Sequence, residues 1–180
     1  MAELRRIYVD SCCFIDLVKT DIGKMLSSDK EHNVWFLKRL LEAHRDGEVF
    51  MCTSVLTIAE CRHAGEHDVS ERVKSLFNRF LTSGQYLRLA QLTPFTAQDA
   101  RDLSWVHGIS GLRGPDSIHI ASALEMKCEE FLSDDSRLER VGGQSGPLSR
   151  FGMYVKQPKD TSCLPAKYRQ MEFKDGESPH

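Results

Sequence analysis

The chain has 180 residues and a formal net charge of −2, and 41% of its residues are hydrophobic. This composition is typical of one soluble globular domain with a proper core. The nearly balanced charge excludes a polybasic protein that coats nucleic acid. No apolar run reaches the ~20 residues needed to span a bilayer, and the first residues lead into a strand-like run without a signal peptide. We therefore expect a cytoplasmic protein without membrane contact.

Strand-like and helix-like patterns alternate along the sequence. In chain order we expect a strand over Arg6–Asp10, a turn or short helix over Phe14–Val18, a helix over Glu31–Asp46, a strand over Glu48–Cys52, a helix from Thr53, a helix over Asp68–Leu81, a strand over Tyr86–Leu92, a helix from Thr96, a helix from Pro115 to Leu124, a strand at Phe131–Leu132, a short helix over Asp135–Val141 and an edge strand over Phe151–Val155. This alternation favours an α/β fold with a mostly parallel sheet covered on both faces.

Several local features complete this prediction. The polar stretch from Thr20 to Lys30 is typical of a loop or insertion. Helix caps are expected at Asp68 and from the hydroxyls at Thr53-Ser54. One domain is expected over residues 1–156, followed by a surface tail over 157–180. The six cysteines form no C-x-x-C pair and are expected to be small buried hydrophobes.

Acidic residues follow the ends of predicted strands or begin predicted helices. Asp10 and Asp135 follow strands, with Asp134 beside the latter, and Asp116 lies in the first turn of a helix. Glu60 lies about 9 Å along its helix from Ser54. Open α/β sheets build their sites at the carboxyl ends of strands, so these acids are expected to converge there. The alternative is that each is a separate solvated acid or helix cap.

Converging carboxylates would repel one another and raise their own pKa values. A divalent cation removes this cost, and Mg²⁺ or Mn²⁺ suits carboxylate oxygens. Such an ion activates water and neutralises charge on a phosphate, which predicts phosphodiester hydrolysis. His119 follows Asp116 by three residues and is expected either to hydrogen-bond it or to be a core histidine. Arg113, three residues before Asp116, is a basic residue that could contact substrate phosphates.

Four segments together resemble the PIN-domain family, the PilT N-terminus-like metal-dependent ribonucleases. They occur in family order at Ile7–Ser11, Thr53–Glu60, Pro115–Ala123 and Phe131–Asp135. The resemblance spans residues 6 to 156 loosely and implies a three-layer α/β/α sandwich that cleaves single-stranded RNA with one or two Mg²⁺ or Mn²⁺ ions. Cys12 departs from the pattern, because many members carry Asn at that position.

Residue by residue, the resemblance implies Asp10 and Asp116 as metal ligands and Glu60 as a ligand or a group that orients water. The fourth acid is expected to be Asp135, with Asp134 as the competing choice. Ser11 and Ser133 are expected to add hydroxyl contacts. The toxin branch of the family adds a small antitoxin that covers the acidic cleft. We also expect a homodimer; the aromatic residues assigned to the core or to a dimer face are Trp35, Phe36, Phe77 and Phe80.

Two other functions remain open on the sequence. A catalytically silent PIN-fold module that binds RNA or protein would share the fold, although the presence of all the acids speaks against it. A phosphatase-like hydrolase with an aspartyl nucleophile needs a D-x-D motif. Asp10-Ser11-Cys12 lacks the second aspartate, which argues against a phosphatase-like hydrolase.

Overall fold

The computed structural model describes residues 4–66, 68–82 and 86–170. Five strands form one sheet in the order β3-β2-β1-β4-β5, and every neighbouring pair is parallel. The strands are β1 (Arg5–Val9), β2 (Val49–Ser54), β3 (Arg88–Ala90), β4 (Glu130–Leu132) and β5 (Tyr154–Lys156). The predicted parallel sheet is therefore confirmed.

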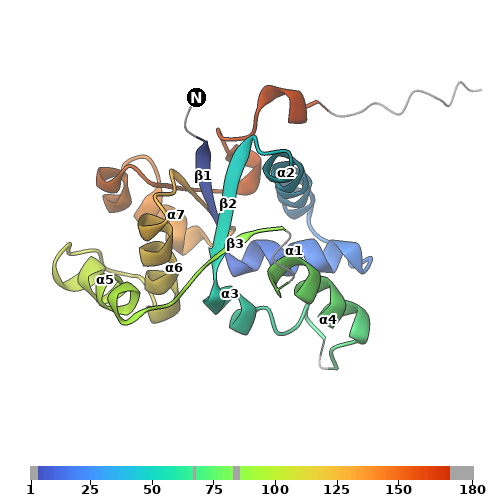
Figure 1. Ribbon diagram of the computed structural model, residues 1–180, viewed down its shortest axis with the longest axis horizontal. Helices are drawn as coiled ribbons and strands as arrows, with labels where there is room; N and C mark the ends of the chain where they lie inside the picture. Colours follow the sequence, from blue (N-terminus) through green and yellow to red (C-terminus); the bar gives the residue numbers. More distant parts are fainter. Residues whose placement is uncertain (1–3, 67, 83–85, 171–180) are drawn as a thin grey trace, which may run out of the picture.

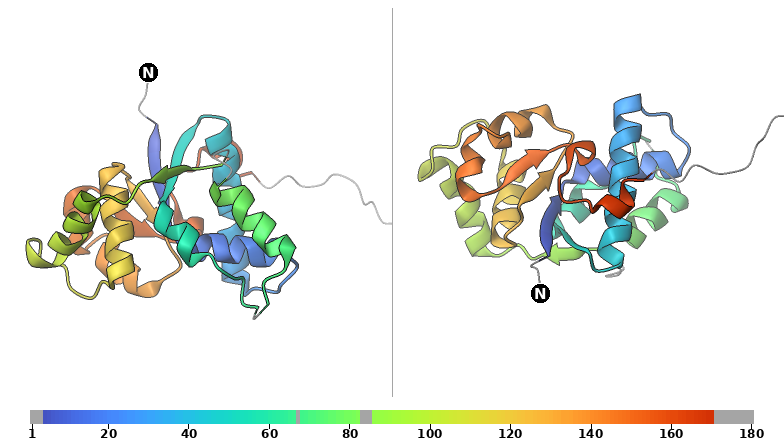
Figure 2. Two further views of the ribbon diagram at one scale, coloured as in Figure 1. Left: turned by 60° about the horizontal axis from the view of Figure 1, so that its bottom comes forward. Right: turned by 90° about the horizontal axis from the view of Figure 1, so that it is seen from above.

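Helices cover both faces of this sheet. They are α1 (Ser11–Asp21), α2 (Ser28–Arg45), α3 (Val55–Glu60), α4 (Glu71–Phe77), α5 (Pro94–Trp105), α6 (Gly114–Glu125) and α7 (Ser136–Gly142). Figures 1 and 2 show α5, α6 and α7 on one face, and α1, α2 and α4 on the other. Within the described ranges, no helix combines the length and the apolar character needed to cross a membrane.

The central strand β1 explains why the fold has three layers. Ile7, Tyr8 and Val9 are all fully buried, because helices pack on both sides of them. Ile7 and Val9 join the core on the α1–α2 face, whereas Tyr8 joins the core on the α5–α6 face. Such a strand carries apolar side chains on both faces, in agreement with the unbroken apolar run in the sequence.

The predicted loop from Thr20 to Lys30 is wrong at both ends. Helix α1 continues to Asp21, and α2 already begins at Ser28, so only residues 22–27 lie between the two helices. The acidic residues Asp29 and Glu31 occupy the first turn of α2, where the helix dipole favours negative charge. The polar residues at the start of α2 therefore resemble a loop in the sequence, although they form the first turn of the helix.

Two predicted helix caps are also wrong. Helix α4 begins at Glu71, and the cap is Ser70, whose hydroxyl accepts a hydrogen bond from the Val73 amide. Asp68 lies outside the helix. Ser54 occupies the cap position of α3 but makes no side-chain capping bond. Its hydroxyl instead lies 3.3 Å from Nδ1 of the buried His119.

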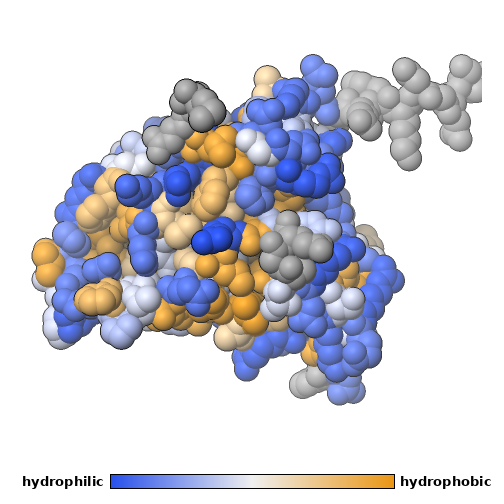
Figure 3. Space-filling view, viewed as in Figure 1, coloured by the Kyte–Doolittle hydropathy of each residue, from blue (hydrophilic) through white to orange (hydrophobic). Residues whose placement is uncertain are grey.

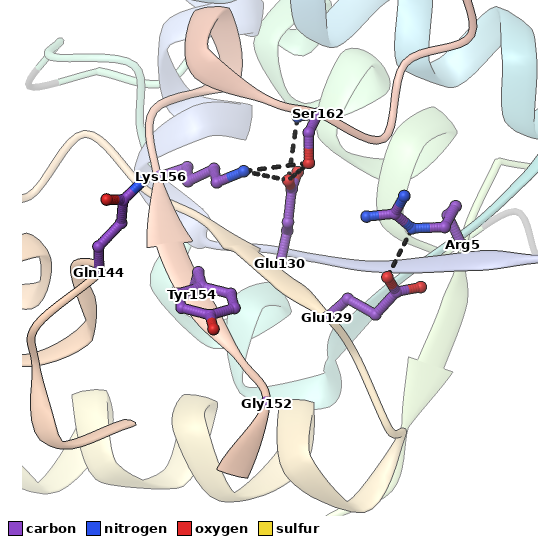
Figure 4. A pocket seen from close by; sticks show the side chains of 8 residues that line it. All are labelled: Arg5, Glu129, Glu130, Gln144, Gly152, Tyr154, Lys156 and Ser162. Carbon is purple, nitrogen blue, oxygen red and sulfur yellow. Dashed lines mark hydrogen bonds and ion pairs between the residues drawn. The ribbon is translucent and has the colours of Figure 1, made fainter. Parts of the chain in front are cut away.

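The segment after β5 packs on the body of the protein as far as residue 170, and the remainder of the predicted tail, 171–180, lies outside the described residues. Cys163 and Leu164 are buried in the core. Glu130 of β4, only 1% exposed, ties this segment down by accepting hydrogen bonds from Thr161 and Ser162. Figure 4 shows Lys156 and Ser162 meeting this carboxylate at the wall of an open cavity of about 430 Å³.

Candidate active site

The carboxyl ends of β1 and β4 lie side by side because the two strands are parallel neighbours. Asp10 follows β1, and Ser133, Asp134 and Asp135 follow β4. Helices α1 and α3 begin at the same edge, in the lower middle of Figure 1. The cavity of Figure 4 is lined by residues such as Arg5 and Glu129, which lie at the opposite ends of these strands. It is therefore separate from the group of acids at the carboxyl ends.

Asp10 is a buried carboxylate held by short hydrogen bonds. It caps α1 by accepting from the Ser11 amide at 2.7 Å, and its other oxygen accepts from the Ser133 hydroxyl at 2.7 Å. The Cys12 thiol lies 3.3 Å from that second oxygen. Only 7% of Asp10 is exposed. The neighbouring strand and helix therefore fix the carboxylate in one orientation at the sheet edge.

Glu60 approaches Asp10 from the end of α3 and is oriented by His119. The Nε2 atom of His119 lies 2.8 Å from Glu60 Oε2, and its Nδ1 atom lies 2.6 Å from the Tyr8 hydroxyl. The hydrogen bond from His119 lowers the pKa of Glu60, and a hydrogen bond from Ser11 adds to this effect. A buried chain of polar groups thus runs from the core to this carboxylate.

The expected contact of His119 with Asp116 is not formed. One turn of helix separates the two residues, but His119 is 2% exposed and faces the interior. Asp116 lies in the first turn of α6 and accepts a hydrogen bond from the Arg113 amide at 3.3 Å. The sequence spacing placed both residues on one helix face but could not show that Glu60 comes between His119 and the surface.

Asp10, Glu60 and His119 form a group that fits a metal ion. One ligating atom from each lies within 4.8 Å of the other two. Two carboxylate oxygens and an imidazole nitrogen suit Mn²⁺, and the oxygens also suit Mg²⁺. The contact of His119 Nε2 with Glu60 resembles the outer-shell bonds that commonly hold a metal ligand in place. Donor chemistry and spacing therefore both fit a divalent cation.

Asp116 and Asp135 form the second part of the site, with Arg137 of α7 between them. The Arg137 guanidinium contacts both Asp135 oxygens, and its Nη2 atom lies 4.0 Å from Asp116 Oδ2. The hydrogen bonds from Arg137 lower the pKa of Asp135. They also raise the pKa of Arg137, and the charges of Asp116 and Asp10 act on it in the same direction. Both Asp135 and Arg137 therefore stay charged near neutral pH.

The side chain of Asp134 contacts α2 instead of α7. Its carboxylate pairs with Lys30 at 3.0 Å and lies 3.4 Å from the Asn33 amide nitrogen, both on α2. Asp135 alone of the two shares Arg137 with Asp116. This geometry favours Asp135 as the fourth acid. Ser133 contacts Asp10, and Ser11 contacts both Asp10 and Glu60, so both hydroxyls lie within the site.

Sequence analysis missed two members of the site. Tyr8 lies in an apolar strand, and nothing in the local pattern distinguishes its hydroxyl from that of a core tyrosine. Arg137 follows Asp135 by two residues, where the Asp135 side chain also accepts the Arg137 amide at 2.9 Å. This turn at the start of α7 was a detectable signal, because an aspartate that caps a helix lies close to the second residue of that helix.

Residues 7–144 match the PIN domain family. No curated protein sequence matches the chain. Among solved structures, the crystal structure of FitAcB from Neisseria gonorrhoeae is 16% identical in sequence, and the match covers 86% of this chain and 99% of that chain with a TM-score of 0.49.

Proposed function

This chain belongs to the PIN domain family, and on that premise we propose that it is a metal-dependent endoribonuclease that hydrolyses single-stranded RNA. PIN domains are generally nucleases. The observation that carries the proposal is the group of Asp10, Glu60 and His119 at the carboxyl edge of the sheet, with ligating atoms within 4.8 Å. Asp116 and Asp135 complete the acidic site through Arg137.

Each residue has a chemical task in this proposal. Asp10 and Glu60 offer carboxylate oxygens for Mg²⁺ or Mn²⁺ on one side of the site, and Asp116 and Asp135 offer theirs beside Arg137 on the other side. When bound, the ion lowers the pKa of a water molecule and neutralises charge that develops on the phosphate. Glu60, kept ionised by the hydrogen bond from His119, can accept a hydrogen bond from the attacking water and orient it.

Removal of divalent metal tests the proposal directly. We expect the purified protein to cleave single-stranded RNA with added Mn²⁺ and to lose this activity in excess chelator. Restoring Mn²⁺ should restore cleavage, and Asp116→Asn should remove it under all conditions. Gel analysis of an end-labelled RNA measures each rate. Equal cleavage in all four conditions would reveal a contaminating nuclease or a metal-independent reaction and would contradict the proposal.

Replacing His119 by leucine should weaken Mn²⁺ binding about 10- to 100-fold, the range seen when a residue that orients a metal ligand is lost. Leucine fills the buried space but cannot hold Glu60. Calorimetric titration with Mn²⁺ measures the change. His107→Leu is the matched control, because it makes the same replacement at an exposed histidine that is not part of the proposed site. An unchanged affinity in a folded His119→Leu protein would show that this histidine is only a core residue.

We also propose a protein partner, an RNA contact and a cytoplasmic location. A small antitoxin is proposed to cover the acidic site, and Arg113, exposed beside Asp116, is proposed to contact an RNA phosphate. The six cysteines are free thiols, which suits the reducing cytoplasm. The antitoxin and the RNA contact depend on the nuclease proposal.

A homodimer is also proposed, through exposed apolar side chains and not through Phe77 or Phe80 of the expected aromatic set. Phe77 and Phe80 are buried in the core. Apolar side chains gather over β2 and β3 in the middle of the face shown in Figure 3. The large exposed apolar residues on α3, on α5 and beside α5 are Ile58, Leu92, Phe95, Trp105 and Val106. Exposed apolar patches commonly mark association surfaces, and sedimentation velocity measures such association.

A further inference from the structure

Arg137 is a positive charge built into a site that is otherwise acidic. Its Nε atom lies 3.0 Å from Asp135 Oδ1, its Nη2 atom contacts Asp135 Oδ2, and the same Nη2 lies 4.0 Å from Asp116 Oδ2. The side chain is 32% exposed, so it lies at the rim of the site. A bidentate pair of this kind is a strong and directional contact.

This arginine divides the site into two parts. The ligating atoms of Asp10, Glu60 and His119 lie close together, and no lysine or arginine among the described residues is hydrogen-bonded to them. On the other side, the negative charges of Asp135 and Asp116 already face the guanidinium. Among the described residues, one part of the site thus has no directly bonded lysine or arginine, and the other part has Arg137.

We propose that Arg137 supplies the second positive charge of the site, so that the chain binds one divalent cation, on the Asp10–Glu60 side, rather than two. This inference rests on the proposed nuclease function and specifies its metal content. A second dication near Asp135 would have to displace a charged guanidinium from both carboxylate oxygens or remain close to it, and like charges repel.

The charge of Arg137 is permanent under ordinary conditions. Arginine does not lose its proton in proteins. Only substitution, or a competing anion such as a substrate phosphate, would remove this charge from the acids.

Counting Mn²⁺ ions tests the inference. We would titrate the full chain with Mn²⁺ by calorimetry and record electron paramagnetic resonance spectra, in which two neighbouring ions show a spin–spin coupling that a single ion lacks. The wild-type protein and Arg137→Lys, which keeps the charge, should each bind one ion per chain. Arg137→Gln should bind two. Arg140 is an exposed residue on the same helix, and Arg140→Gln should bind one ion per chain, as the wild type does.

Each outcome decides the matter. Two coupled ions in the wild-type protein, or a single ion in a folded Arg137→Gln protein, would overturn the inference while leaving the nuclease proposal intact. The wild-type count applies even if Arg137→Gln does not fold, which circular dichroism would reveal. An absence of any Mn²⁺ binding, together with absent RNA cleavage, would overturn both the inference and the proposed function.

Discussion

Replacing Asp10 by asparagine is expected to slow RNA cleavage about 1,000-fold while leaving the fold intact. Asp10 is the most buried carboxylate of the site and the one that both parts of the site share, because it lies beside Glu60 and also acts on Arg137. A metal ion contributes several kcal/mol to such a reaction, and a loss of ~4 kcal/mol corresponds to this factor. Asparagine keeps an oxygen that can still cap α1.

Single-turnover cleavage of an end-labelled RNA measures the rate, and thermal unfolding monitors the fold. Asp29→Asn is the control, because Asp29 is a highly exposed acid at the start of α2, paired only with Lys159 in the described part of the chain. It should leave cleavage unchanged. If Asp10→Asn destabilises the protein, Asp116→Asn makes the same test at the first turn of α6. Full activity in either folded variant would argue against the acidic site.

The position of Asp10 and Asp135 could be predicted from the sequence for a simple physical reason. Each follows a short apolar strand, and parallel neighbouring strands bring their carboxyl ends to one edge. The choice between Asp134 and Asp135 needed coordinates. The two acids are adjacent in sequence, but one meets Lys30 of α2 and the other meets Arg137 of α7.

Long-range polar contacts mark the limit of such prediction. Glu60 and His119 are 59 residues apart, and their contact depends on how α3 and α6 pack on the sheet. Local patterns also misled at the start of α2, where polar residues that belong to the first helical turn resembled a loop. Hydrophobic periodicity reports which face of an element is buried, but it does not report which polar groups meet beneath that face.

A second large effect is expected from Lys156→Met, which should lower the free energy of unfolding by about 3 kcal/mol, because it leaves the buried carboxylate of Glu130 without its cation. Lys156 Nζ lies 2.6 Å from Glu130 Oε1, and Glu130 is 1% exposed. Burial alone would raise the pKa of Glu130, but hydrogen bonds from Lys156, Ser162 and Thr161 outweigh burial and lower the pKa to about 2.

The converse change, Glu130→Gln, should cost less. The amide oxygen can still accept from Ser162, the Thr161 hydroxyl can accept from the amide nitrogen, and Lys156, whose side chain is 24% exposed, can turn toward solvent. Lys167→Met is the surface control. It breaks the pair with Glu48, in which the side chains are 59% and 43% exposed, and such pairs contribute less than about 1 kcal/mol. Equal losses in Lys156→Met and Lys167→Met would contradict the assigned role of Glu130.

The pH dependence separates this charge effect from lost packing. Because the pKa of Glu130 is lower in the folded protein than its ordinary value, its contribution is present above about pH 5 and is lost as the pH falls toward 2. Urea unfolding of the wild type and of Lys156→Met should therefore differ by about 3 kcal/mol at pH 7 and by about half as much at pH 3. A difference that stays constant over this range would mean that the methylene groups of Lys156, and not its charge, hold the C-terminal segment in place.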